Sequence, residues 1–253
     1  MGFRLTMYRK LLGVSSFSTF AALRKEVPRN LKNKSKTAQE WISRQLSDPY
    51  VKEARIHNFR CRSAFKLLQI DEKYQILKPG DIVIDCGAAP GSWSQIAVTK
   101  TNSNGKEPEL PTGKVIGIDK ITVSPIEGAI FLCPYDFTAE NTQARILQEL
   151  NGSKVDSVLS DMAPNATGHK RMDHEYLMEM VYSVLRFAVL NTKINGTLLV
   201  KVWNGNGIND YENNLKKFYN NVKVVKPDSS RDDSAEMYFL ARQFKGARQK
   251  TTS

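Results

Sequence analysis

The sequence predicts an α/β protein built around a largely parallel β-sheet, and three observations lead to this prediction. Short apolar segments with the length of buried strands recur along the chain, and most are followed by stretches with helical periodicity. Several of these strand-like segments end in an acidic residue, and one runs into a small-residue turn at residues 87–91. Alternating strands and helices form sheets in which the carboxyl ends of the parallel strands share one edge, where ligands bind.

The chain of 253 residues is most simply one folded domain, which we place at residues 37–245, between a basic leader at 1–36 and a basic tail at 246–253. A hydrophobic content of 41% fits a soluble globular chain, and no apolar run approaches the roughly 20 residues of a membrane span. The cysteines Cys61, Cys86 and Cys133 show no metal-ligand spacing, and their odd number argues against a disulfide framework. We therefore expect a reducing compartment.

Residues 1–36 have the composition of a mitochondrial presequence. They contain nine Lys and Arg but only one acid, Glu26, so they carry most of the net charge of +11. Serine, threonine, phenylalanine and leucine separate the basic residues, and the short, interrupted apolar run disfavours a secretory signal. We expect import into the mitochondrial matrix. The alternative is a disordered basic arm that contacts RNA directly.

The segment from residue 37 to residue 70 has helical periodicity with a break at Asp48 and Pro49. Beyond the break, residues 52–66 read as a basic helix with interleaved phenylalanines. Its cations, opposed only by Glu53, are Lys52, Arg55, Arg60, Arg62 and Lys66. Such a cluster suits contacts to phosphates and bases. The alternative is a solvated helix face with Phe65 and Leu68 in the core.

The first predicted strand begins at Ile82 and ends in the turn at residues 87–91, after which residues 92–98 look helical. Small residues let the backbone approach a nucleoside-bearing ligand, but the turn lacks both the G-x-G-x-x-G spacing and a phosphate-binding loop. Taken alone, it is either a ligand loop or a tight packing turn. The next strand, at 114–120, contains Asp119 near its end, in a position suited to binding two ribose hydroxyls.

Further elements follow in the same alternation. We expect a strand at 129–133, a helix at 138–150 capped by Thr138, and a strand at 155–161 that ends in Asp161 and opens into a polar loop. The apolar stripe at 173–190 predicts a helix packed in the core. A strand at 196–203, a helix at 209–219 and strands at 222–226 and 237–241 complete the domain, with Glu236 at the start of the last strand.

Lys201 lies within the otherwise apolar strand at 196–203, and a lysine there is costly unless it is paired or used. Distant strand ends meet at one edge of the sheet, so Lys201 can meet Asp161, Glu236 and Lys66 there. A lysine beside a second cation in a dry pocket loses its proton more easily, which would let it act as a base. No metal site is expected, because the three histidines form no ligand pattern, and no G-x-S-x-G motif supports a serine hydrolase.

The sequence resembles the FtsJ (RrmJ) family of S-adenosylmethionine-dependent ribosomal RNA 2′-O-methyltransferases. The residues of its motifs are most similar to those of the mitochondrial branch. The resemblance runs from about residue 41 to residue 241. Its motifs are RSAFKL (62–67), DCGAAPGSWSQ (85–95), LSDMAPN (159–165), LLVKVW (198–203), KPDSSR (226–231) and SAEMYFLA (234–241). It implies a Rossmann-like class I methyltransferase fold, with a mostly parallel seven-stranded sheet and helices on both faces. Ser92 stands where the bacterial pattern commonly has a second glycine.

The resemblance also implies site residues. A catalytic tetrad falls on Lys66, Asp161, Lys201 and Glu236, in which Lys201 deprotonates or orients the ribose 2′-hydroxyl. The cofactor, S-adenosyl-L-methionine, is expected to contact three groups of residues. These are Pro90, Gly91, Ser92 and Trp93 on the methionine side, Asp119 at the ribose with Asp136 and Phe137 at the adenine, and Asp161 at the methyl-bearing end.

The expected partner is mitochondrial large-subunit rRNA or the assembling large subunit, with a uridine ribose as the target and no DNA, because only RNA offers a 2′-hydroxyl. The basic segment and the tail after Glu236 are the expected backbone contacts, with residues 166–173 at the substrate mouth. We expect a monomer without a metal. Alternatives are a tRNA or mRNA-cap 2′-O-methyltransferase, a non-catalytic ribosome-assembly factor and a small-molecule O-methyltransferase.

Overall fold

The computed structural model describes residues 35–231 and 234–247, and the chain divides into two compact units, Met1–Asp48 and Pro49–Ser253. The described part of the first unit is mainly helix α2 (Lys36–Ser47). Apart from Ser35 and Lys36, the predicted leader lies outside the described residues, as does the predicted tail beyond Ala247. No helix within the described ranges is both long and apolar enough to span a membrane.

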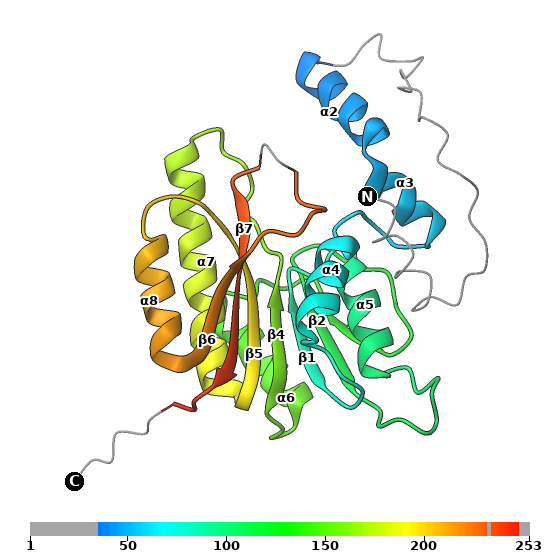
Figure 1. Cartoon of the computed structure of the whole chain (residues 1–253), viewed down its shortest axis with the longest axis vertical. Helices are drawn as coiled ribbons and strands as arrows, with labels where there is room; N and C mark the ends of the chain where they lie inside the picture. The colour runs from blue at the N-terminus through cyan, green and yellow to red at the C-terminus, as the bar shows by residue number, and fades with distance from the viewer. Residues whose placement is uncertain (1–34, 232–233, 248–253) are drawn as a thin grey trace. The chain divides into compact units, whose positions relative to one another are not determined.

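The second unit contains one seven-stranded sheet with the order β3-β2-β1-β4-β5-β7-β6 (Figure 1). Its strands are β1 (Ile82–Cys86), β2 (Lys114–Ile118), β3 (Ala129–Leu132), β4 (Val155–Ser160), β5 (Thr192–Trp203), β6 (Tyr219–Val225) and β7 (Glu236–Phe244). Within this sheet β7 pairs antiparallel with both β5 and β6, and the remaining pairs are parallel. The predicted mostly parallel α/β fold is therefore confirmed.

Helices cover both faces of the sheet (Figure 1). One face packs against α4 (Ala64–Tyr74) and α5 (Ser92–Thr101), which follow α3 (Pro49–Ile56). The other face packs against α6 (Glu140–Leu150), α7 (Lys170–Asn191) and α8 (Ile208–Phe218). The largest apolar cluster lies on this second face, where Ile84, Ile116 and Val200 of the strands meet Leu177 and Leu215 of α7 and α8. The charged strand residues of the site point to the first face.

Two sequence-based element predictions were wrong in detail. The basic segment at 52–66 is not one helix. Helix α3 ends at Ile56, Asn58 then adopts a left-handed φ of 57°, and α4 begins only at Ala64. Helix α6 begins at Glu140 with Ala139 at its N-cap position. Thr138 does not cap it, because its hydroxyl instead donates to the Asp136 carboxylate at 2.7 Å.

Helix α4 is anchored at its carboxyl end by a buried carboxylate. Asp71 Oδ1 accepts hydrogen bonds from the backbone N–H groups of Ile76 and Leu77, both at 3.0 Å. Its Oδ2 forms an ion pair with Lys100 of α5 at 2.9 Å, and the Asp71 side chain is only 3% exposed. This anchor joins α4 to α5 and to the segment that enters β1.

Replacing Asp71 with alanine should therefore lower the free energy of unfolding by about 3 kcal/mol, because two N–H donors lose their acceptor and the partly buried Lys100 ammonium loses its counter-charge. Asp71→Asn keeps an oxygen acceptor for the two N–H groups and should cost clearly less. Urea unfolding followed by circular dichroism measures both values. An Asp71→Ala protein within about 0.5 kcal/mol of the wild type would contradict this assignment.

Candidate active site

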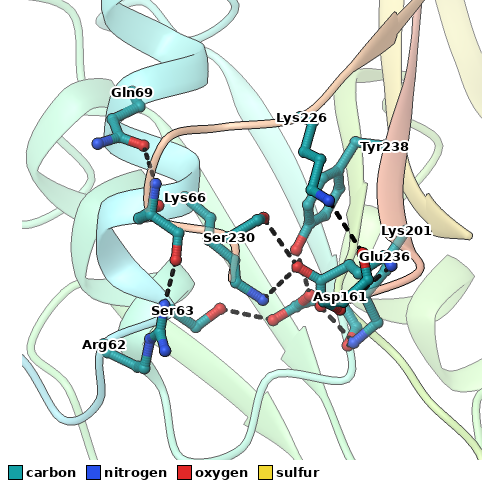
Figure 2. Close-up of polar contacts among 12 residues, drawn as sticks. Arg62, Ser63, Lys66, Gln69, Asp161, Lys201, Lys226, Ser230, Glu236 and Tyr238 are labelled. Carbon is teal, nitrogen blue, oxygen red and sulfur yellow. Dashed lines mark hydrogen bonds and ion pairs between the residues drawn. The ribbon is translucent and has the colours of Figure 1, made fainter. Parts of the chain in front are cut away.

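Four ionisable side chains that are far apart in the sequence meet at the carboxyl edge of the sheet (Figure 2). Lys66 Nζ lies 2.6 Å from Glu236 Oε1, and Lys201 Nζ lies 3.1 Å from Asp161 Oδ1. The four side chains are between 8% and 17% exposed, so water reaches them only in part. The structure thus brings together all four residues of the predicted tetrad as two adjacent ion pairs.

Strand register explains this convergence. Lys201 of β5 stands directly opposite Tyr238 of β7, and Trp203 stands opposite Glu236. Side chains two residues apart in a strand share a face, so Lys201, Tyr238 and Glu236 all point to the face covered by α4. Lys66 lies in the first turn of α4, above the same face. Asp161 follows the last residue of β4, the strand beside β5.

The Asp161 carboxylate is the most heavily contacted group of the site. Ser63 Oγ donates to its Oδ2 at 2.6 Å, and Tyr238 Oη donates to its Oδ1 at 2.7 Å. Lys201 also donates to the Asp161 backbone carbonyl. Burial raises the pKa of Asp161, but the charges of Lys201 and Lys66 and the bonds from Ser63 and Tyr238 outweigh it, so the pKa lies below its ordinary value. The group is therefore a buried anion.

Glu236 is held by the loop that precedes β7. Ser230 Oγ donates to Glu236 Oε1 at 3.0 Å, on the oxygen that also receives Lys66. The loop is attached to α4, because the Ser229 N–H donates to Gln69 Oε1 at 2.9 Å and the Arg62 guanidinium donates to the Ser229 carbonyl. Figure 2 shows these bonds beside the tetrad. The KPDSSR motif thus links the basic segment to Glu236.

Sequence reasoning did not single out Ser63, Ser230 or Tyr238 as site residues. Tyr238 could have been identified, because it lies two residues after Glu236 in the predicted last strand and so shares its face. Ser230 lies in a recognised motif. Ser63 also lies in a recognised motif, RSAFKL, but its contact with Asp161 spans 98 residues of sequence and could not be read from that motif.

The small-residue turn supplies backbone groups to the same edge. Gly87 has a φ of 81°, and a Cβ there would come within 2.5 Å of the Met162 side chain. Gly91, with a φ of 112°, occupies the N-cap position of α5. The helix N-terminus presents free N–H groups that favour polar or anionic ligand atoms. Glycine at position 87 therefore lets the turn pack closely against Met162.

Two residues predicted at the turn use their side chains inside the protein. Ser92 is 3% exposed, and its hydroxyl lies 3.0 Å from Cys61 Sγ. Trp93 is 2% exposed, donates from Nε1 to the Ser63 carbonyl at 2.9 Å, and packs against Tyr238 with a centroid distance of 5.8 Å. What these two residues can offer a ligand is therefore their backbone, while Pro90 is exposed.

Asp119 and Asp136, at the ends of neighbouring strands, are partly engaged. Asp119 Oδ2 accepts from the Ala89 N–H of the turn at 2.8 Å, and its Oδ1 accepts from the Ile121 N–H. Asp136 pairs with Lys120 at 2.9 Å and accepts from Thr138. Burial raises the pKa of Asp136, but the bonds from Lys120 and Thr138 lower it by more than burial raises it. The pKa of Asp136 therefore lies below its ordinary value. Both carboxylates keep lone pairs for hydroxyl or amino donors.

Phe137 does not line an open site with its ring. It is 2% exposed and packs edge-on against Phe187 of α7, with ring centroids 5.5 Å apart. Its backbone, which follows Asp136, is the part that could meet a ligand.

Asp85, the next-to-last residue of β1 before the turn, is an unusual carboxyl. It is fully buried, Ser94 Oγ donates to its Oδ2 at 2.7 Å, and its Oδ1 has no hydrogen-bond partner among the described residues. Burial, opposed by the Ser94 bond and reinforced by the negative charges of Asp161 and Asp119, raises its pKa to about 7. An unmatched oxygen beside the glycine turn fits a site that receives a donor from a bound polar molecule.

The described residues contain no cluster of three or more His, Cys, Asp or Glu that could hold a metal ion. A surface hollow of about 500 Å³ lies along α7 from His174 to Arg186 and reaches Asn206 and Gly207. It contains none of the predicted site residues. The carboxyl edge holds two lysines, each paired with a carboxylate, close to the glycine turn.

Comparison with known proteins identifies the family. The family described as FtsJ-like methyltransferase matches residues 59–244. Over 241 residues the chain is 49% identical to the Drosophila melanogaster protein named rRNA methyltransferase 2, mitochondrial, and the match covers 95% of each chain. Over 217 residues it is 42% identical to ribosomal RNA large subunit methyltransferase E of Parvibaculum lavamentivorans, covering 85% of each.

A solved structure is also similar. It comes from a Plasmodium falciparum protein provisionally named a ribosomal RNA methyltransferase, and it superposes with a TM-score of 0.65 at 31% identity. The match covers 75% of this chain and 100% of the other.

The raised pKa of Asp85 predicts a pH-dependent stability. A carboxyl with a higher pKa in the folded state than its ordinary 3.8 binds more protons when folded. Its contribution therefore favours folding at low pH and declines as the pH rises toward 7. Asparagine at position 85 stays neutral at every pH. The difference in free energy of unfolding, Asp85→Asn minus wild type, should therefore rise between pH 3.8 and about 7 by up to about 1.4 kcal/mol per pH unit. Urea titrations over the pH series test this, and parallel curves for the two proteins would contradict it.

Proposed function

This chain belongs to the FtsJ-like methyltransferase family, and from that premise we propose that it methylates a uridine ribose 2′-hydroxyl in mitochondrial large-subunit rRNA with S-adenosyl-L-methionine. The observation that carries the proposal is the paired cluster of Lys66, Asp161, Lys201 and Glu236 at the edge that also holds the glycine turn. Both relatives described above are named as rRNA methyltransferases.

When bound, S-adenosylmethionine supplies a methyl group on a sulfonium, which is already an activated leaving group, so the protein contributes mainly proximity and a base. In this proposal the backbone of residues 90–93 holds the methionine side. Asp119 binds the ribose hydroxyls, and Asp136 with the backbone of Phe137 binds the adenine. The partly free carboxylates of Asp119 and Asp136 and the N–H groups at the start of α5 suit such a molecule.

Lys201 is the proposed group that meets the 2′-hydroxyl, which it orients or deprotonates for in-line attack on the methyl carbon. Asp161 holds the Lys201 ammonium in place through its carboxylate and its backbone carbonyl. Ser63 and Tyr238 hold Asp161 in turn. Lys66 places a second positive charge nearby, which helps to hold Lys201 in its reactive state, and Glu236 positions Lys66.

RNA is the proposed substrate class because only RNA offers a 2′-hydroxyl. Within the basic segment, Lys52 and Arg55 remain on α3 as proposed phosphate contacts. Arg60 and Arg62 instead donate to backbone carbonyls of the protein. Residues 166–173 are proposed to border the substrate entrance, where Asp173 accepts from the N–H and hydroxyl of Thr167 and orders the loop.

The proposed location is the mitochondrial matrix, and the proposed biological role is support of large-subunit biogenesis. The basic leader composition supports this, as does the name of the Drosophila relative. Methylation of tRNA or of an mRNA cap would use the same chemistry. A non-catalytic assembly factor would need the fold and RNA binding but not the lysine pairs.

Lys201→Ala should abolish methyl transfer, with a loss of at least about a hundredfold expected for removal of a general base. Its circular dichroism spectrum and its affinity for S-adenosylhomocysteine should stay close to those of the wild type. Lys193→Ala is the matched control, because Lys193 lies on the same strand, is exposed and pairs with Asp156. Full activity of Lys201→Ala would refute the mechanism.

Nucleotide-resolution mapping of ribose methylation in mitochondrial RNA, with and without the protein, tests the substrate. One uridine of large-subunit rRNA should lose its methyl group in depleted cells and regain it with the wild type but not with Lys201→Ala. Loss of a ribose methyl group from tRNA or from an mRNA cap in the depleted cells would instead identify that RNA as the substrate. Unchanged marks, together with assembly restored by Lys201→Ala, would favour the non-catalytic role.

A further inference from the structure

We propose that Arg60 is a positioning residue for the cofactor site, where it fastens the glycine turn at residues 87–91 to the loop that follows Asp119. This proposal rests on the proposed function, because it concerns the site that would hold S-adenosylmethionine. It also assigns to Arg60 a different task from the phosphate contact that its place in a basic segment predicts.

The Arg60 guanidinium donates to three backbone carbonyls from two separate loops. Its Nη1 lies 2.8 Å from the Pro90 carbonyl oxygen in the glycine turn and 2.7 Å from that of Ser124. Its Nη2 lies 2.9 Å from the carbonyl oxygen of Pro125. Ser124 and Pro125 lie in the loop between β2 and β3, shortly after Asp119. One planar, rigid fork therefore joins the ends of β1 and β2.

Arg60 packs closely against Gly91, whose φ of 112° favours glycine. A Cβ at Gly91 would come within 2.5 Å of Arg60 Nη1 and within 3.0 Å of Ile126 Cδ1. Gly91 is the N-cap residue of α5. The guanidinium thus packs directly against the backbone from which the N–H groups of the helix start project.

The backbone of Arg60 is itself fixed to the same helix. Its N–H donates to Gln95 Oε1 at 2.9 Å, and Gln95 Nε2 donates to the Asn58 carbonyl at 3.0 Å. The loop between α3 and α4 is therefore tied to α5 at Asn58 and at Arg60. This anchoring gives the arginine side chain a defined origin from which to reach the two loops.

The chemistry of these contacts favours a fastening role. Over residues 35–231 and 234–247, Arg60 forms no ion pair with a carboxylate, and its guanidinium donates to neutral carbonyls. Two of these carbonyls belong to prolines, which have no N–H of their own. Asp119 joins the same two loops a second time through the Ala89 N–H. Arg60 and Asp119 thus hold the turn from opposite sides, by a donor and by an acceptor.

Such fastening affects ligand binding through preorganisation. A turn already held in its binding geometry does not have to be ordered when the ligand arrives, so less binding free energy is lost. Removing the fork should therefore weaken the binding of the cofactor more than that of RNA. A phosphate contact would behave in the opposite way and would depend on salt.

Isothermal titration of the protein with S-adenosylhomocysteine, in the absence of RNA, tests the proposal. Arg60→Ala should bind about tenfold or more weakly, the equivalent of losing one charge-assisted hydrogen bond, and Arg60→Lys should fall between it and the wild type. Hydrogen exchange should be faster at residues 87–93 and 120–127 in the free Arg60→Ala protein. Arg186→Ala, which removes an exposed arginine on α7 in the other helix layer, should match the wild type.

The other outcomes are distinct. Unchanged S-adenosylhomocysteine affinity in either Arg60 variant, together with a raised KM for RNA, would overturn the proposal and assign a phosphate contact. Unfolding of both variants would overturn it in favour of a general structural role. If the wild type itself fails to bind S-adenosylhomocysteine, the proposed function fails, whereas weak binding by Arg60→Ala alone supports both.

Discussion

The buried carboxylate of Asp161 is the interaction on which the rest of the site depends. A buried anion is costly unless several partners compensate it, and here Ser63, Lys201 and Tyr238 do so from three separate segments. These segments are the entry to α4, β5 and β7. Any change in how α4 or β7 packs on the sheet would leave this charge without partners. The same requirement therefore stabilises the packing and brings the two lysines together.

The antiparallel strand β7 has a particular consequence for the site. It lies between β5 and β6, so its first residues return to the carboxyl edge of a sheet whose other strands run the opposite way. Because β7 is reversed, its first residues, Glu236 and Tyr238, lie beside Lys201. A parallel strand would have brought its last residues there instead. The loop before β7 is held to α4 through Ser229 and Gln69, which keeps Glu236 within reach of Lys66.

The opposite half of the edge is built mainly from backbone. The side chains of Ser92, Trp93 and Phe137 are buried, so what remains for a ligand is the backbone at the start of α5 and the carboxylates of Asp119 and Asp136. Backbone groups have few ways to move once their loops are fixed, which suits a site that must hold a cofactor in one orientation. Arg60 and Asp119 provide that fixation.

The sequence by itself determined the α/β class, the strands and the positions of the strand-end acids, because hydrophobic periodicity and turn chemistry are local properties. It also indicated the tetrad residues through their motifs. Only the tertiary structure decided which groups pair. The loop between α3 and α4, the inward Trp93 and Phe137, and the use of Arg60 and Arg62 on carbonyls could not be predicted. Each depends on contacts between residues that are tens to more than a hundred positions apart, as between Arg62 and Ser229, and composition carries no information about such contacts.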